Sequence, residues 1–196
     1  MVSTLAKEKS SLSYIELRRS LRVPRVHPNG LVQLSLNDEG TKRLHIWPDT
    51  PIEVRAVAMP IHDHIYNFES TVIVGALWHL VYEIEQNPQG DYRVYNVFAQ
   101  STKKDAPLER MDDCRYNARL VEKLCITAGE EYSFERFRFH ESIPVGFTAT
   151  IFSTSDFNPI DKPRLLCPAN ETYDNSFRRD SSDPEFLWSI IKRVCD

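Results

Sequence analysis

The stretch PIHDHIYNFESTVIVGAL, residues 60–77, joins two histidines to a long apolar, β-branched run. His62 and His64 are two residues apart, and alternate side chains of an extended chain point to the same side. Glu69 follows five residues after His64, a distance at which a tight turn would return its carboxylate to the imidazoles. We therefore expect this stretch to lead into a strand and to carry ligands of a metal ion.

Strand-like runs continue along most of the chain, separated by turn residues such as HPNG (27–30) and NPQG (87–90). We predict strands at 31–36, 43–47, 52–59, 70–85, 91–98, 118–126, 131–140 and 147–153, with a turn at 143–146 and an exposed loop at 99–115. A short helix at 14–21, capped by Ser13 with Glu16 completing the capping box, precedes the strands. A second helix begins at Pro184, with Asp183 as its candidate N-cap, and its predicted apolar face comprises Phe186, Leu187, Ile190, Ile191 and Val194. The pattern predicts a mainly β fold, a barrel or sandwich with a helix at each end.

The length of 196 residues fits one domain with a substantial core. We divide the chain into a flexible tail (1–12), a barrel domain with its leading helix (13–156), and an irregular arm with a C-terminal helix packed on the same domain (157–196).

Composition narrows the function classes. The net charge of −4 argues against a nucleic-acid partner, because phosphate backbones require a concentrated basic surface. No apolar stretch has the roughly 20 residues of a membrane span, so we expect no membrane partner. The four cysteines form no C-x-x-C pair, and the start MVSTLAKEKSS has no apolar signal segment. We therefore expect reduced thiols and a cytoplasmic location.

His62, His64, Glu69 and Gly75 form the pattern H-x-H-x4-E-x5-G. This pattern resembles the first motif of the cupin superfamily, G-x5-H-x-H-x3,4-E-x6-G, with a last spacer one residue shorter and without the leading glycine. The resemblance covers about residues 31–153 and implies a cupin-type double-stranded β-helix, also called a jelly roll. A further ligand histidine is expected in the second cupin motif, and His140 is the histidine in that part of the chain.

A local resemblance narrows the family further. The region from Arg43 to His64, which contains RLHIWPD and IHDH, is similar to thiol dioxygenases of the cysteine dioxygenase type. Many of these enzymes hold iron with three histidines alone, whereas the cupin pattern adds a carboxylate. The resemblance thus implies His62, His64, Glu69 and His140 as the ligands, with Asp63 on the opposite side. Imidazoles with one carboxylate suit iron(II) first, with nickel, manganese or zinc as alternatives, and not calcium or magnesium.

The strand at 43–47 supplies candidates for substrate binding. Alternation puts Arg43, His45 and Trp47 on one face. If that face looks inward, the guanidinium suits a carboxylate-bearing substrate; the solvent-facing alternative fits alternation equally well. Tyr66 and Arg138 are further candidates, and His79 is compatible with either a pocket or an exposed position.

The resulting prediction is a mononuclear non-haem iron oxygenase acting on a small molecule. A non-catalytic cupin that binds a small molecule or serves as a scaffold is the first alternative, and a metal-dependent isomerase or lyase is the second. Fold and motif do not separate these functions. We also expect a homodimer, because exposed edge strands invite pairing and twofold dimers are the commonest oligomers.

Overall fold

The computed structural model describes residues 12–50, 52, 60–98, 105–171, 176–178 and 183–195. The predicted tail (1–12) and the predicted strand at 52–59 lie almost entirely outside these residues. The described elements are α2 (Tyr14–Arg19), β1 (Arg25–His27), β2 (Leu31–Ser35), β3 (Lys42–Trp47), β4 (Asn67–Gln86), β5 (Tyr92–Val97), β6 (Asp105–Arg110), β7 (Tyr116–Thr127), β8 (Glu131–Phe134), β9 (Phe139–Ser155), β10 (Arg164–Pro168), β11 (Ser176–Arg178) and α3 (Pro184–Cys195).

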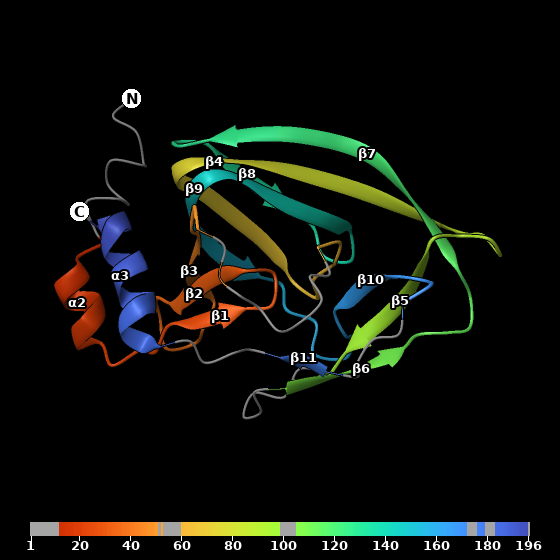
Figure 1. Ribbon diagram of the computed structural model, residues 1–196, viewed down its shortest axis with the longest axis horizontal. Helices are drawn as coiled ribbons and strands as arrows, with labels where there is room; N and C mark the ends of the chain where they lie inside the picture. The colour runs from red at the N-terminus through yellow and green to blue at the C-terminus, as the bar shows by residue number, and fades with distance from the viewer. Residues whose placement is uncertain are drawn as a thin grey trace.

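The strands form one antiparallel sheet in the order β1-β2-β3-β9-β4-β7-β5-β6-β11, with β8 added to β4 and β10 to β5. Its centre is the long pair β4 and β9, and the sheet curls around them into a half-barrel (Figure 1). The predicted mainly β chain with a helix near each end is therefore confirmed.

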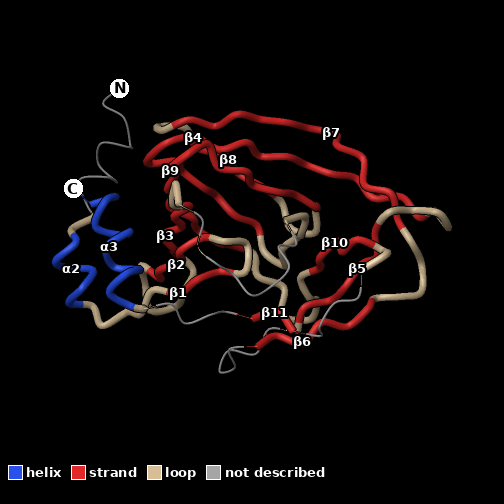
Figure 2. The backbone as a smooth tube through the Cα atoms, in the orientation of Figure 1, coloured by secondary structure: helices blue, strands red, loops and turns tan. Residues whose placement is uncertain are grey.

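Alternation along the central strands separates two faces. In β3, Leu44 and Ile46 are fully buried against the helices, whereas Arg43, His45 and Trp47 line a cavity on the other face. The two helices lie side by side at one end of the sheet (Figure 2), where Tyr14 of α2 meets Trp188 of α3 edge to face. The core on this side is formed chiefly by β2, β3, β9 and α3, and includes Val32, Leu34, Leu44, Ile46, Ile151, Leu187, Ile191 and Val194.

Both helix starts follow the predicted capping chemistry. The Ser13 hydroxyl accepts a hydrogen bond from the Glu16 amide, and an Asp183 carboxylate oxygen accepts one from the Glu185 amide at 3.0 Å. On α3 the predicted apolar face is buried except at Phe186, which is 47% exposed; its assignment to the packed face was wrong.

Gly75 lies at an irregularity in the centre of β4, where the pairing with β9 shifts register. Its φ of +74° is a left-handed conformation, and a Cβ atom there would lie 2.3 Å from the carbonyl oxygen of Phe147. Glycine meets both requirements, because it tolerates positive φ and permits close backbone approach.

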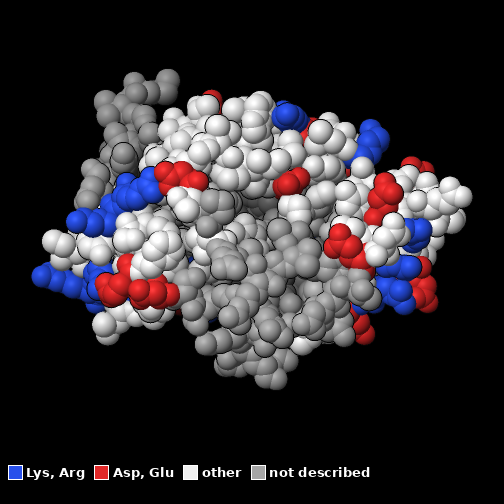
Figure 3. Space-filling model, in the orientation of Figure 1, with Lys and Arg blue, Asp and Glu red and all other residues white. Residues whose placement is uncertain are grey.

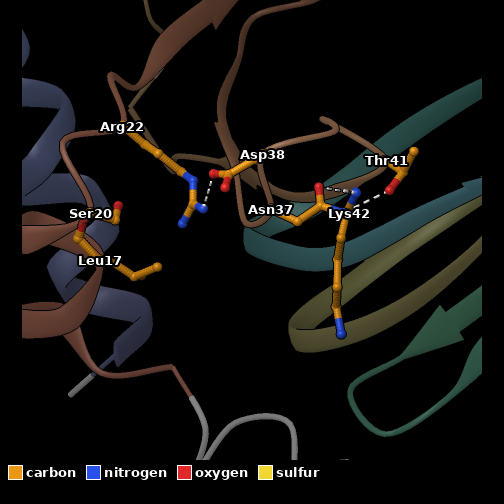
Figure 4. Close-up of polar contacts among 7 residues, drawn as sticks. All are labelled: Leu17, Ser20, Arg22, Asn37, Asp38, Thr41 and Lys42. Carbon is orange, nitrogen blue, oxygen red and sulfur yellow. Dashed lines mark hydrogen bonds and ion pairs between the residues drawn. The ribbon is translucent and has the colours of Figure 1, made fainter.

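The turn between β2 and β3 is fixed by Asn37 (Figure 4). Its side-chain oxygen accepts from the Lys42 amide at 2.9 Å, and its side-chain nitrogen donates to the Thr41 hydroxyl at 2.7 Å. Asp38 in the same turn pairs with Arg22 at 2.7 Å, which ties the turn to the segment after α2. The turn that precedes Arg43 is therefore anchored by hydrogen bonds and by an ion pair.

Several segments differ from the sequence-based prediction. The predicted loop at 99–115 contains β6, and the predicted irregular arm contains β10. The predicted strand at 131–140 ends at Phe134, so that His140 belongs to β9 instead. The predicted turn at 143–146 lies inside β9, which runs from Phe139 to Ser155. The three domain boundaries themselves stay a prediction.

Charges of both signs are interspersed on the face shown in Figure 3. Within the described ranges, no helix has the length and apolar character needed to cross a bilayer.

Candidate metal centre

The H-D-H segment lies between β9 and β10 as a short extended link. His62 exchanges two backbone hydrogen bonds with His140 of β9, at 3.0 and 2.8 Å. On its other side, the Asp63 amide donates to the Arg164 carbonyl at 3.0 Å, and the Leu166 amide donates to the Ile61 carbonyl at 2.9 Å. The segment is thus held by strands on both sides although it is no regular strand itself.

Alternation within this link separates His62 and His64 from Asp63, as predicted. Asp63 is 1% exposed and forms an ion pair with Arg164, whose Nε donates to the carboxylate at 2.6 Å. The Arg164 amide also donates to Asp63, and its guanidinium reaches the Phe137 carbonyl at 3.2 Å. Burial raises the pKa of Asp63, while the charge and hydrogen bonds of Arg164 oppose that shift. The pair fastens the H-D-H segment to β10.

Three of the four predicted ligands converge. One nitrogen from each of His62, His64 and His140 lies within 4.8 Å of the others, so a single ion could be bound between them. The ring centroids are 4.5 Å apart for His62 and His140, 4.8 Å for His62 and His64, and 5.1 Å for His64 and His140. Three imidazoles on one side of an ion leave other positions open, as catalytic metal sites require.

The imidazoles are in the chemical state that a metal ion needs. Burial lowers the pKa of His62 and takes the pKa values of His64 and His140 well below the ordinary value, so that all three are neutral near pH 7. Nδ1 of His62 lies 2.8 Å from the Pro60 carbonyl oxygen and must donate to it, which leaves the Nε2 lone pair for a metal. Neither ring nitrogen of His140 has a hydrogen-bond partner within the described part of the chain. These donors fit a first-row transition metal.

Glu69 is the fourth predicted ligand, and the structure does not bring it to the histidines. β4 begins at Asn67 and runs straight on instead of turning back. Phe68 and Ser70 line the cavity, so the intervening Glu69 points to the other face, where it is exposed. Among the described residues, the group that could hold a metal consists of the three histidines alone.

A cavity of about 120 Å³ opens beside the three histidines on the concave side of the sheet. The sequence-predicted candidates Arg43, His45, Trp47 and Tyr66 all line it, which decides the face of β3 that alternation left open. Arg138 does not line it: this side chain is exposed and its guanidinium lies 3.9 Å from Glu122.

Arg43 is connected to the histidines through an aromatic ring. Its Nε donates to the Gly40 carbonyl at 2.7 Å, and its guanidinium carbon lies 5.8 Å from the Tyr66 ring centroid. Tyr66 in turn stacks on His64, with ring centroids 4.8 Å apart and planes 15° apart. The Tyr66 ring therefore lies between the Arg43 guanidinium and His64, a candidate metal ligand.

His45 contributes a neutral imidazole to the same wall. Its Nε2 lies 3.0 Å from the Gln33 side-chain nitrogen. Because an amide nitrogen is a donor, His45 accepts this hydrogen bond. Burial, helped by the Arg43 charge, lowers the pKa of His45 to about 3.

Other lining residues were missed by the sequence analysis. They include Phe68, Ser70, Tyr132, Ser142, Thr150 and Phe152, and also His27, the first residue of the turn sequence HPNG. Period-two alternation could have found Ser142, two residues after His140, but pairing between distant strands decides the rest. His79, left open by the sequence, is buried beside His140.

No family model matches this chain, and no curated protein is similar enough in sequence to count as a relative.

Proposed function

We propose that the chain is a metal-binding cupin, specifically a mononuclear non-haem iron oxygenase that acts on a small molecule. The observation that carries the proposal is the convergence of three neutral histidines beside a cavity. The motif resemblance supports the jelly-roll assignment, and the curled antiparallel half-barrel is compatible with it. The absence of a carboxylate from the described group favours the three-histidine arrangement over the one with Glu69.

The donor set supports this chemistry. Three neutral imidazoles leave the full charge of a divalent ion uncompensated, which favours anionic ligands in the open positions. Bound iron(II) would supply the activation of dioxygen. His62, His64 and His140 would hold the ion on one side, and the aromatic rings of Tyr66, Phe68 and Phe152 would restrict water at the reacting atoms.

Arg43 is the proposed substrate-orienting residue. Its Nε donates to the Gly40 carbonyl, and its side chain lines the cavity, where a guanidinium suits a carboxylate or a similar anion. The cavity of about 120 Å³ is compatible with a small substrate.

The test is metal analysis followed by oxygen consumption. Purified protein offered iron(II), nickel, manganese and zinc should bind one equivalent of metal per chain. His62→Ala and His64→Ala should each abolish binding, because each removes one of three ligands. Glu69→Gln is the matched control: it removes a carboxylate from the same motif and should leave the titration unchanged.

Oxygen uptake separates the functional classes. An iron-loaded protein that consumes oxygen with a small anionic substrate supports the oxygenase assignment. Metal binding without oxygen consumption across a panel of thiols and carboxylates would favour the non-catalytic or Lewis-acid alternatives. A wild-type protein that binds none of the four metals would refute the proposal.

A further inference from the structure

His79 lies on β4 beside His140. The two side chains are 1% and 3% exposed. Both ring nitrogens of both residues lack a hydrogen-bond partner among the described residues. Four unpaired polar atoms are therefore buried in one place.

Strand register brings the two rings together. Val81 is opposite His140 and His79 is opposite Ser142, so the two histidines are diagonal neighbours on the same face of the β4–β9 pair. Their ring centroids are 5.0 Å apart, with planes 45° apart. The rings of Tyr132 and Phe134 lie 4.7 and 4.8 Å from His79 and complete an aromatic wall around it.

A leucine or phenylalanine would fill this position without unpaired nitrogens. Burying polar groups without partners is unfavourable, so a buried imidazole between aromatic rings calls for a reason. The Tyr132 hydroxyl is no partner either, since neither ring nitrogen of His79 forms a hydrogen bond within the described residues. Among the rings packed around His79, that of His140 carries unpaired nitrogen atoms of its own.

The candidate ligands differ in what holds their second nitrogen. A histidine that binds a metal almost always donates its other N–H to a fixed acceptor, which sets the tautomer and the ring orientation. Nδ1 of His62 has such an acceptor in the Pro60 carbonyl. His140 has none within the described residues unless His79 provides it.

We propose that His79 is the positioning residue of the metal centre, accepting the N–H of His140 and so directing the other His140 nitrogen at the metal. The centroid separation of 5.0 Å is short enough for such a hydrogen bond when one nitrogen of each ring faces the other. It would pair two of the four buried nitrogens, and metal binding would occupy a third. This inference rests on the proposed metal site and assigns the residue that orients one of its ligands.

The experiment compares three variants of the full-length protein with cobalt(II) as the probe. His79→Leu removes the acceptor, His79→Gln keeps an amide that accepts and donates, and Phe134→Leu alters an aromatic ring that lies 4.8 Å from the His140 ring. Cobalt affinity, the cobalt ligand-field absorption spectrum and the melting temperature of the metal-free protein are measured for each.

We expect His79→Leu to weaken cobalt binding about 10- to 100-fold and to shift the cobalt spectrum, as the loss of an outer-shell partner does. The melting temperature of its metal-free form should not fall, because the variant removes two unpaired buried nitrogens. His79→Gln should recover most of the affinity. Phe134→Leu should show the opposite pattern, with a lower melting temperature and a cobalt spectrum like that of the wild type.

Two outcomes would overturn the inference: a His79→Leu protein with wild-type affinity and spectrum, or a His79→Gln protein as weak as His79→Leu. Both are distinguishable from failure of the proposed function. If the proposed function fails, the wild-type protein itself will bind no cobalt, and His62→Ala will not change the cobalt titration.

Discussion

His62 and His140, which are 78 positions apart in the sequence, lie directly opposite one another and exchange both of their backbone hydrogen bonds, at 3.0 and 2.8 Å. The backbone pairing alone holds their side chains on one side of the link. The position of His64 then follows from alternation along the same segment. The candidate metal centre therefore depends on how firmly the H-D-H segment is held against β9 and β10.

Breaking the buried ion pair between Asp63 and Arg164 tests whether the metal centre depends on the attachment of the H-D-H segment. Arg164→Met leaves the Asp63 carboxylate, which is fully buried, without its partner. Breaking a buried pair from one side costs about 3–5 kcal/mol of unfolding free energy. We expect urea denaturation to show a loss of this order and metal affinity to fall with it. Replacing both residues, as Asp63→Leu with Arg164→Met, should recover part of the stability; a double variant as unstable as the sum of the singles would contradict the assignment.

Gly75 offers a second test, with Gly30 as a matched control. Both glycines have positive φ, +74° and +76°, but a Cβ at Gly30 would meet nothing within 4 Å, whereas one at Gly75 would collide with the Phe147 carbonyl. Gly30→Ala should cost about 1–2 kcal/mol for the left-handed backbone. Gly75→Ala should cost at least about 1 kcal/mol more, because the strand must also shift. Thermal unfolding measures the loss of stability in each variant. Equal melting temperatures for Gly75→Ala and Gly30→Ala would contradict the steric argument.

The contrast between β4 and β9 shows what the sequence could and could not predict. Alternation correctly placed His62 and His64 together and Asp63 apart, because that rule holds for any extended chain. The turn predicted at 143–146, which contains Pro144 and Gly146, was wrong, because these residues lie inside β9. Among the described residues, Pro144 of β9 pairs with Leu77 on one side, and the pairing of β9 with β3 stops at Thr148. Proline therefore stands at an edge of the described sheet, a position that tolerates it.

Glu69 was wrongly placed for a related reason. The spacing H-x-H-x4-E is compatible with a tight turn and with a straight strand, and only the straight strand puts Glu69 outside. His140, by contrast, was assigned by resemblance, and its meeting with His62 depends on pairing over a long sequence separation. Local patterns carry no information about such pairing. The same limit applies to His79, whose neighbours come from β8 and β9.

The outer edge of β7 underlies the prediction of a homodimer. One side of this strand pairs with β4 along its length, whereas the described residues pair its other side only where Tyr116 meets Tyr92. Leu120 and Leu124 are 46% and 41% exposed on this strand. A long exposed strand edge of this kind is a template for strand pairing. We expect a second copy to pair there, giving a mass by light scattering close to twice the chain's 22.8 kDa.

Leu124→Lys should convert this dimer to a monomer, because it removes an exposed apolar side chain and adds a second positive charge beside Lys123 on the edge strand. Ile160→Lys is the control, since Ile160 is also exposed but lies outside the sheet. Wild-type protein with the mass of one chain at micromolar concentration would exclude the dimer.

His45 predicts how the stability of the metal-free protein depends on pH. In the folded protein its pKa is lowered to about 3, by burial first and by Arg43 second, from an ordinary value of 6.5. Below pH 6.5 the unfolded chain therefore binds a proton that the folded protein does not. The free energy of unfolding is highest above pH 6.5 and falls as the pH is lowered toward 3. The largest possible slope for one such group is about 1.4 kcal/mol per pH unit, and partial exposure of the ring reduces it.

His45→Gln removes the titrating group while keeping a side chain able to accept from Gln33. In urea denaturation at pH 7, 6 and 5, the variant should lose less stability per pH unit than the wild type, by roughly 1 kcal/mol per unit at most. Above pH 7.5 the two stabilities should run parallel, because His45 is then neutral in both the folded and the unfolded chain. The other buried histidines steepen the acid-side loss in both proteins, so the difference between the two slopes reports His45 together with the effect of its charge on His64. Identical slopes between pH 7 and 5 would show that the folded ring takes up its proton as readily as the unfolded chain does.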